Sequence, residues 1–422
     1  MKSNSLLFLL LMAPIVLFSQ VKTSDLQLNT ITTSVPFLAI TPDSRAGAMG
    51  DAGTALSASA NSIYWNTSML IFSKKKSEIG VSYTPWLRQL TKDMHLSYIS
   101  GYKKLNDRHV VGASLKYFSL GNITFTDNAG NVLRDDKPSE FELAGAYAFR
   151  LGKRMSLGIN GKFVYSNLTG GFTVQGVDTK AGIAGAADVS FTYLNDDAKI
   201  GNTRGVYTFA ATINNIGNKI AYSSTSNNDF IPINLKIGNS FKANFDKYNS
   251  LVVALDLQKL LVPTPPKYVN EGTGSAPNWV LASGQTNDVG VVSGMIQSFY
   301  DAPGTLVKDA QGKYVKNGDG TYQVESGSKL IEELNEINIC LGLEYWYNNA
   351  FALRAGYFYE NETKGNRQFF NAGIGMKYNK FGIDISYLGA ITRNSPLANT
   401  IRFGLTFDLG GNDTAKSDSN PE

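Results

Sequence analysis

From residue 78 onward, apolar side chains recur at every second position of the chain. In residues 401–409, each odd position is apolar and each even position is small, polar or charged. Residues 337–345, 351–359 and 381–387 repeat this alternation. Segments of about ten residues with alternating polarity, separated by turn residues, are typical of membrane-spanning β-strands. The pattern therefore predicts an all-β protein whose strands each have one apolar face.

The alternation predicts fourteen strands, an even number, as in bacterial single-chain outer-membrane barrels. The predicted strands are 78–87, 94–104, 108–119, 139–150, 154–166, 181–193, 204–214, 231–243, 248–261, 335–347, 350–360, 366–378, 381–390 and 398–409. Every second connection tends to be short: 105–107, 151–153, 195–203, 244–247, 348–349 and 379–380. The other connections include 121–138, 167–180, 216–230 and 262–334. Because such barrels have short periplasmic turns and longer extracellular loops, we predict a 14-stranded antiparallel outer-membrane β-barrel.

Aromatic residues near the predicted strand ends indicate two belts at the membrane boundaries, where amphipathic rings are favoured. The periplasmic belt would contain Tyr102, Phe149, Tyr193, Phe241, Trp346, Tyr378 and Phe407. The outer belt would contain Trp86, Phe118, Tyr165, Tyr359 and Tyr387. A simpler interpretation is the general preference of aromatic residues for strands.

The N-terminus has the form of a secretory signal peptide, with Lys2, an apolar run at 6–18 and the small Ser19. Polar residues follow at 20–24, too soon for a spanning helix of about 20 apolar residues. The domains we predict are a signal peptide (1–19), an N-terminal extension with a lumenal plug (20–77), the β-barrel (78–409) with the long extracellular loop 262–334, and a disordered C-terminal tail (410–422).

The plug is predicted from residues 42–66, PDSRAGAMGDAGTALSASANSIYWN, which are rich in Gly, Ala and Ser. Small side chains would let a short helical hairpin pack closely against the inner wall, with Asp43 or Ser44 capping its first turn. Because the stretch precedes the first strand, we expect it to enter the lumen from the periplasmic side. The expected plug residues are Arg45, Gly47, Met49, Gly50, Gly53, Tyr64, Trp65 and Asn66.

Charged residues on the predicted strands are expected to face the lumen, because each would cost several kcal/mol on the lipid face. They are Lys116, Lys162, Asp188, Asp256, Glu344, Arg354, Asp384, Arg402 and Asp408. They could line a permeation path, or they could pair with one another and anchor the plug. We favour anchoring, with Arg45 as a partner for one of the acids.

The long loop is the largest departure from a minimal barrel. Its segment 287–304 places apolar side chains at helical spacing, 306–324 resembles a small hairpin, and 328–334 can form a second short helix. Long structured loops are usually functional, because ordering them costs entropy. The residues expected to contact a partner are Val289, Val292, Met295, Ile296, Phe299 and Tyr300. The alternative is a lid over the barrel mouth.

Composition argues against several classes of function. The net charge is +4 and no basic run is longer than residues 74–76, so we expect no nucleic-acid partner. The only histidines, His95 and His109, lie roughly 25 Å apart at the usual rise per strand residue, and neither has a nearby catalytic motif. No spacing of His, Cys and carboxylates suggests a metal site. We expect no catalytic residue, no metal and no cofactor.

The run RAGAMGDAGTALSASANSIYWN, residues 45–66, resembles the N-terminal plug of the FadL family of hydrophobic-compound transporters, which are fourteen-stranded barrels. Those proteins typically continue Asn-Pro-Ala, whereas this chain has Asn66-Thr67-Ser68. The longer run VPFLAITPDSRAGAMGDAGTA, residues 35–55, is more similar to the PorV family, the FadL-like barrels of type IX secretion in Bacteroidetes. This resemblance extends more loosely over residues 35–409.

The resemblance to PorV implies a non-catalytic outer-membrane protein that binds cargo at the translocon and shuttles it to the attachment complex. The implied partners are the giant translocon barrel, secreted cargo with a C-terminal β-domain, a PorU-type sortase, and outer-membrane lipid or lipopolysaccharide. The alternatives are a FadL-type transporter of hydrophobic small molecules and a lipid-modifying enzyme. A gap in the wall with an apolar lumenal pocket would favour the transporter; a blocked lumen with an apolar outer loop would favour the shuttle.

Overall fold

The computed structural model describes residues 28–88, 91–126, 129–168, 173–174, 177–223, 228–273, 276–391 and 395–410. The predicted signal peptide lies outside these residues, as does the predicted tail beyond Gly410.

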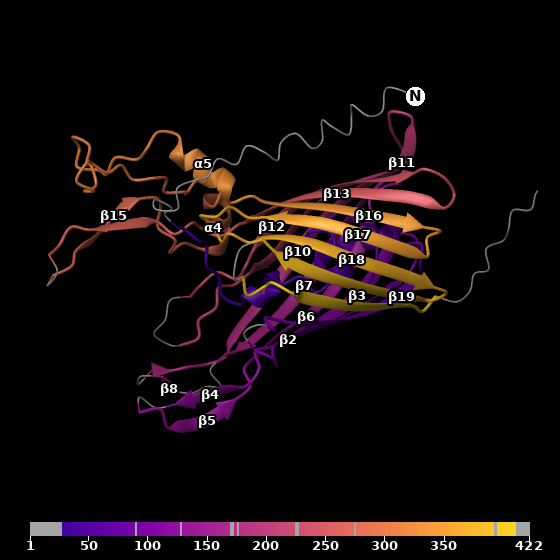
Figure 1. Cartoon of the computed structure of the whole chain (residues 1–422), viewed down its shortest axis with the longest axis horizontal. Coiled ribbons are helices and arrows are strands. Elements are labelled where there is room, and N and C mark those ends of the chain that lie inside the picture. Colours follow the sequence, from indigo (N-terminus) through magenta and orange to yellow (C-terminus); the bar gives the residue numbers. More distant parts are fainter. Residues whose placement is uncertain are drawn as a thin grey trace, which may run out of the picture.

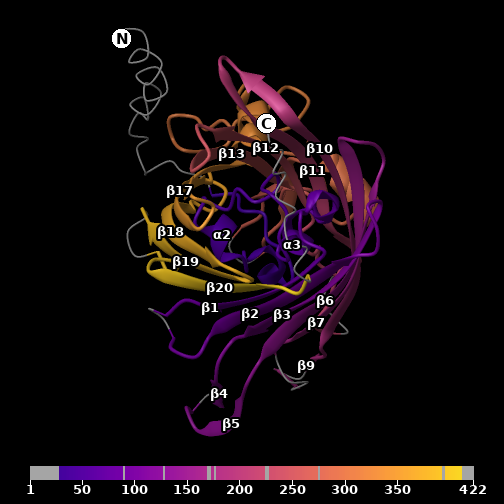
Figure 2. The ribbon, with the colours of Figure 1, turned by 90° about the vertical axis from the view of Figure 1, so that its right-hand side faces the viewer.

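Fourteen antiparallel strands form one closed barrel in which the strands follow one another in chain order and β20 pairs with β1 (Figures 1 and 2). The barrel strands are β1 (Ser77–Pro85), β2 (His95–Lys104), β3 (His109–Ser119), β6 (Ser139–Arg150), β7 (Met155–Asn167), β10 (Gly182–Ile200), β11 (Thr203–Gly217), β12 (Asn234–Asn244), β13 (Asn249–Leu260), β16 (Asn338–Tyr347), β17 (Phe351–Tyr359), β18 (Gln368–Tyr378), β19 (Phe381–Ala390) and β20 (Thr400–Asp408). The predicted fold class and strand number are confirmed.

Alternating polarity sets the two faces of the wall. In β20, Ile401, Phe403 and Leu405 point outward and are exposed, whereas Arg402 between them is only 2% exposed. The apolar side chains thus face the bilayer and the polar ones face the lumen. Within the described residues, none of the helices has the length and apolar character needed to cross a membrane.

One predicted turn is wrong. Residues 195–203 were expected to be a connection, but β10 continues to Ile200 and β11 begins at Thr203, so this hairpin extends beyond the neighbouring turns (Figure 1). A shift in strand register lies between Asn195 and Ala198. The alternation ends here because a strand that has left the bilayer needs no apolar face.

The aromatic belts are correct only in part. Tyr102, Phe118 and Trp346 are buried and face the lumen, and Trp86 packs against an apolar cluster at the outer end. Side chains along a strand point alternately to the lumen and to lipid. A ring near a strand end therefore lies in a belt only if its side chain points to lipid, as those of Tyr378 and Tyr387 do.

The connections opposite the short turns contain the remaining structure, and by the usual orientation of such barrels they are extracellular. Small hairpins pair β4 (Ile123–Thr126) with β5 (Val132–Asp136), β8 (Thr173–Val174) with β9 (Val177–Asp178), and β14 (Lys267–Asn270) with β15 (Trp279–Ser283). The long loop also contains the helices α4 (Val291–Gln297) and α5 (Ser328–Asn335), which confirms both predicted helices.

Residues 306–324 differ from the single hairpin that was expected. Two tight turns are closed by the pairs Lys308–Tyr314 and Lys316–Tyr322, and Leu306 pairs with Val324 at their base. Backbone hydrogen bonds of 2.9–3.0 Å link positions 307, 315 and 323 in a triangle. The segment is therefore a compact three-cornered unit.

Candidate functional site: the plugged lumen and the outer loop surface

The segment before β1 lies inside the barrel, as the indigo ribbon in Figure 2 shows. It contains the 3-10 turns η3 (Pro36–Ala39) and η4 (Thr67–Phe72) and the one-turn helices α2 (Ser44–Gly47) and α3 (Ser62–Trp65). The plug is therefore mostly turns rather than a helical hairpin. Short turns suit a segment whose polar groups bond to the wall instead of to a long helix.

This segment enters the lumen from the outer side and not, as expected, from the periplasmic side. The Asn29 backbone nitrogen donates to Thr363 O at 3.0 Å, and its side chain donates to Pro265 O at 3.2 Å. Both acceptors belong to outer connections, so residues 28–34, which we call the leader, descend from the outer side. The chain leaves the lumen after η4, at the end with the short turns, and β1 begins there.

Asp43 organises the plug internally. Its carboxylate caps α2 by accepting from the backbone nitrogens of Arg45 at 3.0 Å and Ala46 at 3.4 Å. It also accepts from the Asn61 amide at 2.9 Å and from Trp65 Nε1 at 3.2 Å. Burial raises the pKa of Asp43, with a further contribution from Asp384. One short side chain thus ties α2 to α3.

A chain of buried charges anchors the plug to the wall. Arg45 donates to Glu344 of β16 through Nη2 at 2.6 Å and through Nε at 2.8 Å. Arg354 of β17 donates to the same carboxylate at 2.7 Å and to Asp384 of β19 at 2.7 Å. Burial alone would lower the pKa of Arg45, but the charge and hydrogen bonds of Glu344, together with the charges of Asp384 and Asp43, raise it overall. The predicted pairing of Arg45 with an inward acid is confirmed.

Glycines on both sides allow the plug to approach the wall. Gly50 has a φ of +65°, and a Cβ there would lie 2.5 Å from Tyr357 O. Gly342 of β16 faces Met49, and Gly356 of β17 faces the Gly50 nitrogen. A side chain at any of these positions would push the backbone of the plug away from the backbone of the wall. A Cβ at Gly47 would collide with the Arg402 side chain, and a Cβ at Gly53 would collide with the Trp65 ring.

Polar groups on other strands complete the attachment. Lys116 of β3 donates to Leu38 O at 3.1 Å and to Ile40 O at 2.6 Å. Asp256 of β13 accepts from the Thr54 nitrogen at 2.8 Å. Asn66 donates from its side chain to Thr54 O at 2.9 Å and to Thr192 of β10 at 2.8 Å. These contacts surround the plug, and they favour anchoring over a permeation path as the role of the inward charges.

A cavity of about 490 Å³ lies on the outer side of the plug. Tyr64 and Trp65 form part of its floor, and residues 30–33 of the leader form part of its wall. Six of its lining residues are charged: Asp51, Lys236, Glu336, Glu360, Lys364 and Arg367. The Lys236 ammonium lies 4.9 Å from the Tyr64 ring centroid and 4.6 Å from that of Trp65. The cavity therefore combines aromatic surface with many charges.

At the outer end of the barrel, the long loop exposes apolar side chains (Figure 1). Four of the six predicted partner-binding residues are exposed: Val292 (68%), Ile296 (60%), Phe299 (52%) and Tyr300 (60%). Val289 and Met295 instead pack on the apolar cluster that contains Phe230, so α4 has one buried and one exposed face. On α5, Leu330, Ile331 and Leu334 are exposed as well. We call these seven exposed residues the outer apolar surface.

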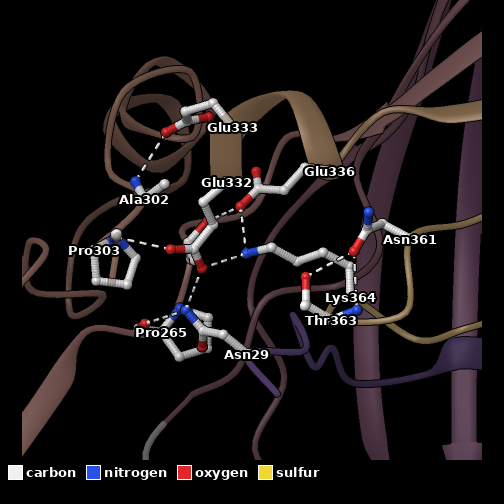
Figure 3. A network of polar contacts seen from close by, with 12 residues as sticks. Asn29, Pro265, Ala302, Pro303, Glu332, Glu333, Glu336, Asn361, Thr363 and Lys364 are labelled. Carbon is white, nitrogen blue, oxygen red and sulfur yellow. Dashed lines mark hydrogen bonds and ion pairs between the residues drawn. The ribbon is translucent and has the colours of Figure 1, made fainter. Parts of the chain in front are cut away.

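A buried polar network fixes α5 to the barrel and to the leader (Figure 3). Glu332 accepts from the Asn29 amide at 2.9 Å, from Lys364 at 2.8 Å and from the Gly304 nitrogen at 2.8 Å. Glu336 pairs with Lys364 at 2.9 Å and with Lys259 of β13 at 2.5 Å. Burial alone would raise the pKa of Glu332, but Lys364 and Asn29 lower it overall.

Sequence reasoning missed this network and the inward Lys236. Lys236 lies two and four positions before Gly238 and Ser240 in β12, so its side chain points to the same face of the wall. The alternation along β12 could therefore have indicated that Lys236 faces the lumen. Asn29, Glu332 and Lys364 come from three separate segments, and no local pattern connects them.

The described residues contain no group of three His, Cys, Asp or Glu side chains that could hold a metal ion. His95 lies at the outer end of β2 and His109 at the opposite end of β3, where its Nδ1 is 2.7 Å from the Tyr147 hydroxyl. The two imidazoles lie at opposite ends of the barrel, as expected.

The closed wall, the inward charges and the internal plug define a plugged fourteen-stranded β-barrel of the outer membrane. The chain belongs to the PorV family, because the family model for type IX secretion system protein PorV matches residues 23–267. It is thus an outer-membrane component of type IX secretion. No curated protein matches the chain.

Similar solved structures include transport barrels. The toluene transporter TbuX of Ralstonia pickettii is 13% identical, with a TM-score of 0.43, 87% of this chain covered and 96% of that chain. TodX of P. putida is 11% identical, with a TM-score of 0.46 and coverages of 87% and 98%. A Pseudomonas aeruginosa FadL homologue is 11% identical, with a TM-score of 0.41 and coverages of 90% and 99%. Values this low carry no argument about function.

Proposed function

We propose that this protein is a non-catalytic carrier of type IX secretion. It binds the C-terminal β-domain of secreted cargo at the translocon barrel and passes the cargo to a PorU-type sortase. The observation that carries this proposal is a plug anchored inside the lumen, together with an ordered outer loop that has exposed apolar side chains. Such a barrel is suited to presenting a surface rather than conducting a solute.

The outer apolar surface has the chemistry of a protein interface. Aromatic residues are enriched in such interfaces and often carry much of the binding energy. Phe299 and Tyr300 of this surface are both more than half exposed. Their segment is held in place, since Lys259 lies 5.9 Å from the Phe299 ring centroid and pairs with Glu333 of α5 at 3.3 Å. A preordered surface loses less entropy when a partner binds.

Export and lipid contact complete the proposal. Residues 1–19 would be removed as a signal peptide during passage to the outer membrane. Outer-membrane lipid and lipopolysaccharide would contact the outward side chains of the wall. The plug residues would serve to close and brace the barrel, and the exposed residues of α4 would serve as the partner contact.

The alternative is a transporter of hydrophobic small molecules. The cavity above the plug favours it, because a ligand pocket commonly has aromatic walls. Its six charged lining residues argue for a polar occupant, and strand pairing is continuous around the barrel. The carrier is therefore the better supported function.

Affinity purification of the tagged protein from outer membranes in mild detergent, followed by mass spectrometry, tests the proposal. We expect a very large barrel together with secreted proteins that share a C-terminal β-domain. Recovery of a lone barrel carrying fatty acid would contradict the carrier and support the transporter.

A matched pair of variants makes the test specific for the surface. Val292→Ser combined with Ile296→Ser removes apolar area from the exposed side of α4 and should reduce recovery of both partners at least tenfold. Lys308→Ser combined with Lys313→Ser alters the same loop outside the apolar surface and should leave recovery unchanged. Equal recovery with both pairs would show that the partners bind elsewhere.

A further inference from the structure

The periplasmic end of the barrel, where the short turns lie, has a large excess of positive charge. Apart from the β10–β11 hairpin, the residues within two positions of a strand end here include twelve lysines and arginines but only four acids, Glu78, Asp107, Asp246 and Asp408. The whole chain has a net charge of only +4, so the excess belongs to this end and not to the composition. Such a concentration of one sign of charge attracts an anionic partner.

The four acids do not remove this excess. Glu78 pairs with Lys75. Asp408 lies opposite Glu78 in the register of β1 and β20, so both carboxylates are on the lumen side of the wall. Asp246 accepts from two backbone nitrogens of its own turn at 2.7 Å, and Asp107 lies in a turn as well. Even if each acid balances one cation, most of the cations remain in excess.

Four of the short turns, at 105–108, 151–155, 245–248 and 378–381, have a similar composition. Each combines one or two cations with large apolar side chains that are exposed. In the last two turns these side chains are aromatic, and the Lys247 ammonium lies 4.7 Å from the Tyr248 ring centroid. Aromatic side chains favour the boundary of the bilayer, and long cationic side chains reach from there to the headgroups. The composition therefore indicates that these turns lie at the level of the lipid headgroups.

The β10–β11 hairpin, which extends beyond the other turns, differs from them in charge (Figure 1). It contains Asp196 and Asp197 as well as Lys199 and Arg204, so its charges balance. The positive excess is therefore confined to the membrane boundary and does not continue into the part that extends further into the periplasm. This distribution favours a lipid over a soluble periplasmic partner.

The cations at the boundary are not neutralised by the protein itself. The Lys103 side chain is on the same face of β2 as the exposed Ile99, and it therefore points to lipid. The four turns add five further cations. We call these six residues the cationic rim: Lys103, Arg108, Lys153, Arg154, Lys247 and Lys380. Among the described residues, none of the six takes part in an ion pair.

We propose that the cationic rim binds the headgroups of anionic phospholipids, of the phosphatidylglycerol type, in the inner leaflet of the outer membrane. Lys and Arg donate charge-assisted hydrogen bonds to phosphate oxygens, and an anionic lipid surface attracts several such residues at once. The rim comes from four turns distributed around the closed barrel, at β2–β3, β6–β7, β12–β13 and β18–β19, so a lipid annulus can contact all of them. Such binding is independent of the carrier role and fixes the height of the barrel in the bilayer.

Lipid retention by the full-length protein tests the proposal. The protein is reconstituted into vesicles of equal parts phosphatidylglycerol and phosphatidylcholine and extracted in mild detergent, and its retained phospholipids are quantified by mass spectrometry. We expect phosphatidylglycerol to be enriched about threefold or more over the vesicle composition, because several cations act together. Extraction in about 0.5 M salt should remove the enrichment, since screening weakens exposed charge contacts.

A matched pair of triple variants assigns the enrichment to the rim. Lys153→Gln, Arg154→Gln and Lys247→Gln together should at least halve it. Lys308→Gln, Lys313→Gln and Lys329→Gln together remove the same charge from the outer loop and should leave it unchanged. The salt dependence is measured on the unaltered protein, so it carries the test if the rim variant fails to fold.

Four outcomes would overturn the proposal. Retained lipid with the composition of the vesicle, or an enrichment that salt does not change, would show that the rim does not select anionic headgroups by charge. An equal loss of enrichment in both triple variants would make the net charge of the protein responsible, and not the rim. Binding of soluble poly-glutamate to the reconstituted barrel, lost only in the rim variant and without enrichment of phosphatidylglycerol, would assign the rim to an acidic polypeptide.

Discussion

Gly356 of β17 lies against the plug so closely that a Cβ there would be 2.0 Å from the Gly50 nitrogen. The Gly356→Ala variant should therefore force the plug away from the wall, at the cost of about 1–3 kcal/mol that overpacking usually brings. Thermal unfolding in detergent and protease cleavage within residues 42–66 measure the effect. Gly145→Ala is the control, because a Cβ there has open space. Equal behaviour of the two variants would contradict the packing described.

Arg45 is held by a carboxylate that is fully buried. We expect Arg45→Met to destabilise the plugged barrel by about 3 kcal/mol, since removing one partner of a buried pair leaves charge without compensation. The matched control is Lys316→Gln, which breaks the exposed pair with Glu271 and should cost about 0–1 kcal/mol. Unfolding midpoints of the two variants, compared with the unaltered protein, decide between these expectations. Similar midpoints would mean that the plug does not depend on this pair.

We expect Asp301 to make the stability of the long loop depend on pH. Its carboxylate accepts from the Thr264 nitrogen at 3.1 Å and from Gln297 at 3.2 Å, and burial raises its pKa from 3.8 to about 6. A raised pKa means that the folded loop favours the protonated acid. The loop should therefore be more stable near pH 4 and lose stability as the pH rises through 6.

The Asp301→Asn variant tests this dependence, because an amide keeps the acceptor oxygen without the charge. We expect slower protease cleavage of the loop than in the unaltered protein at pH 7–8, and no difference near pH 4. Comparison at matched pH cancels the pH dependence of the protease. A ratio of rates that stays constant with pH would rule out Asp301 as the titrating group.

Among the secondary-structure elements, α5 has the most connections at the outer end. Its Glu332 joins the leader, the β17–β18 connection and the turn at Gly304 (Figure 3). Glu332→Ala should release the leader and raise protease cleavage near residues 28–34 several-fold. Glu325→Ala, just before α5, is the control. Unchanged cleavage in both variants would mean that the leader is held by its backbone contacts alone.

Apart from the β10–β11 hairpin, the strands and the turns of the wall could be predicted from the sequence to within a few residues, because period-two alternation is local. The outer hairpins β4–β5 and β14–β15 could not be predicted in the same way. They lie beyond the bilayer, where both faces can be polar and the alternation that indicates a strand disappears. The helix α4 could be predicted as an element, but which of its sides is buried depends on Phe230, more than sixty positions earlier in the chain.

The orientation of the entire barrel can be checked with single cysteines, since Cys340 is buried and should not react. Lys313 lies in the long loop and Asn202 in the β10–β11 turn, and both are exposed. On intact cells we expect a membrane-impermeant maleimide to label Lys313→Cys strongly and Asn202→Cys at least tenfold less. Permeabilised cells should label both, which controls for reactivity. The reverse labelling pattern would show that the barrel has the opposite orientation in the membrane and that the leader lies on the periplasmic side.

The sequence by itself determined the wall of this protein: an even number of alternating strands, loops sorted by length, and a small-residue segment able to lie inside. Each of these properties depends only on residues that are close together in the sequence. Only the tertiary structure decided that the leader descends from the outer side, that Arg45 meets a carboxylate 299 positions away, and that Trp346 faces the lumen. Closure of β20 onto β1 fixes which distant residues become neighbours, and no local periodicity contains that information.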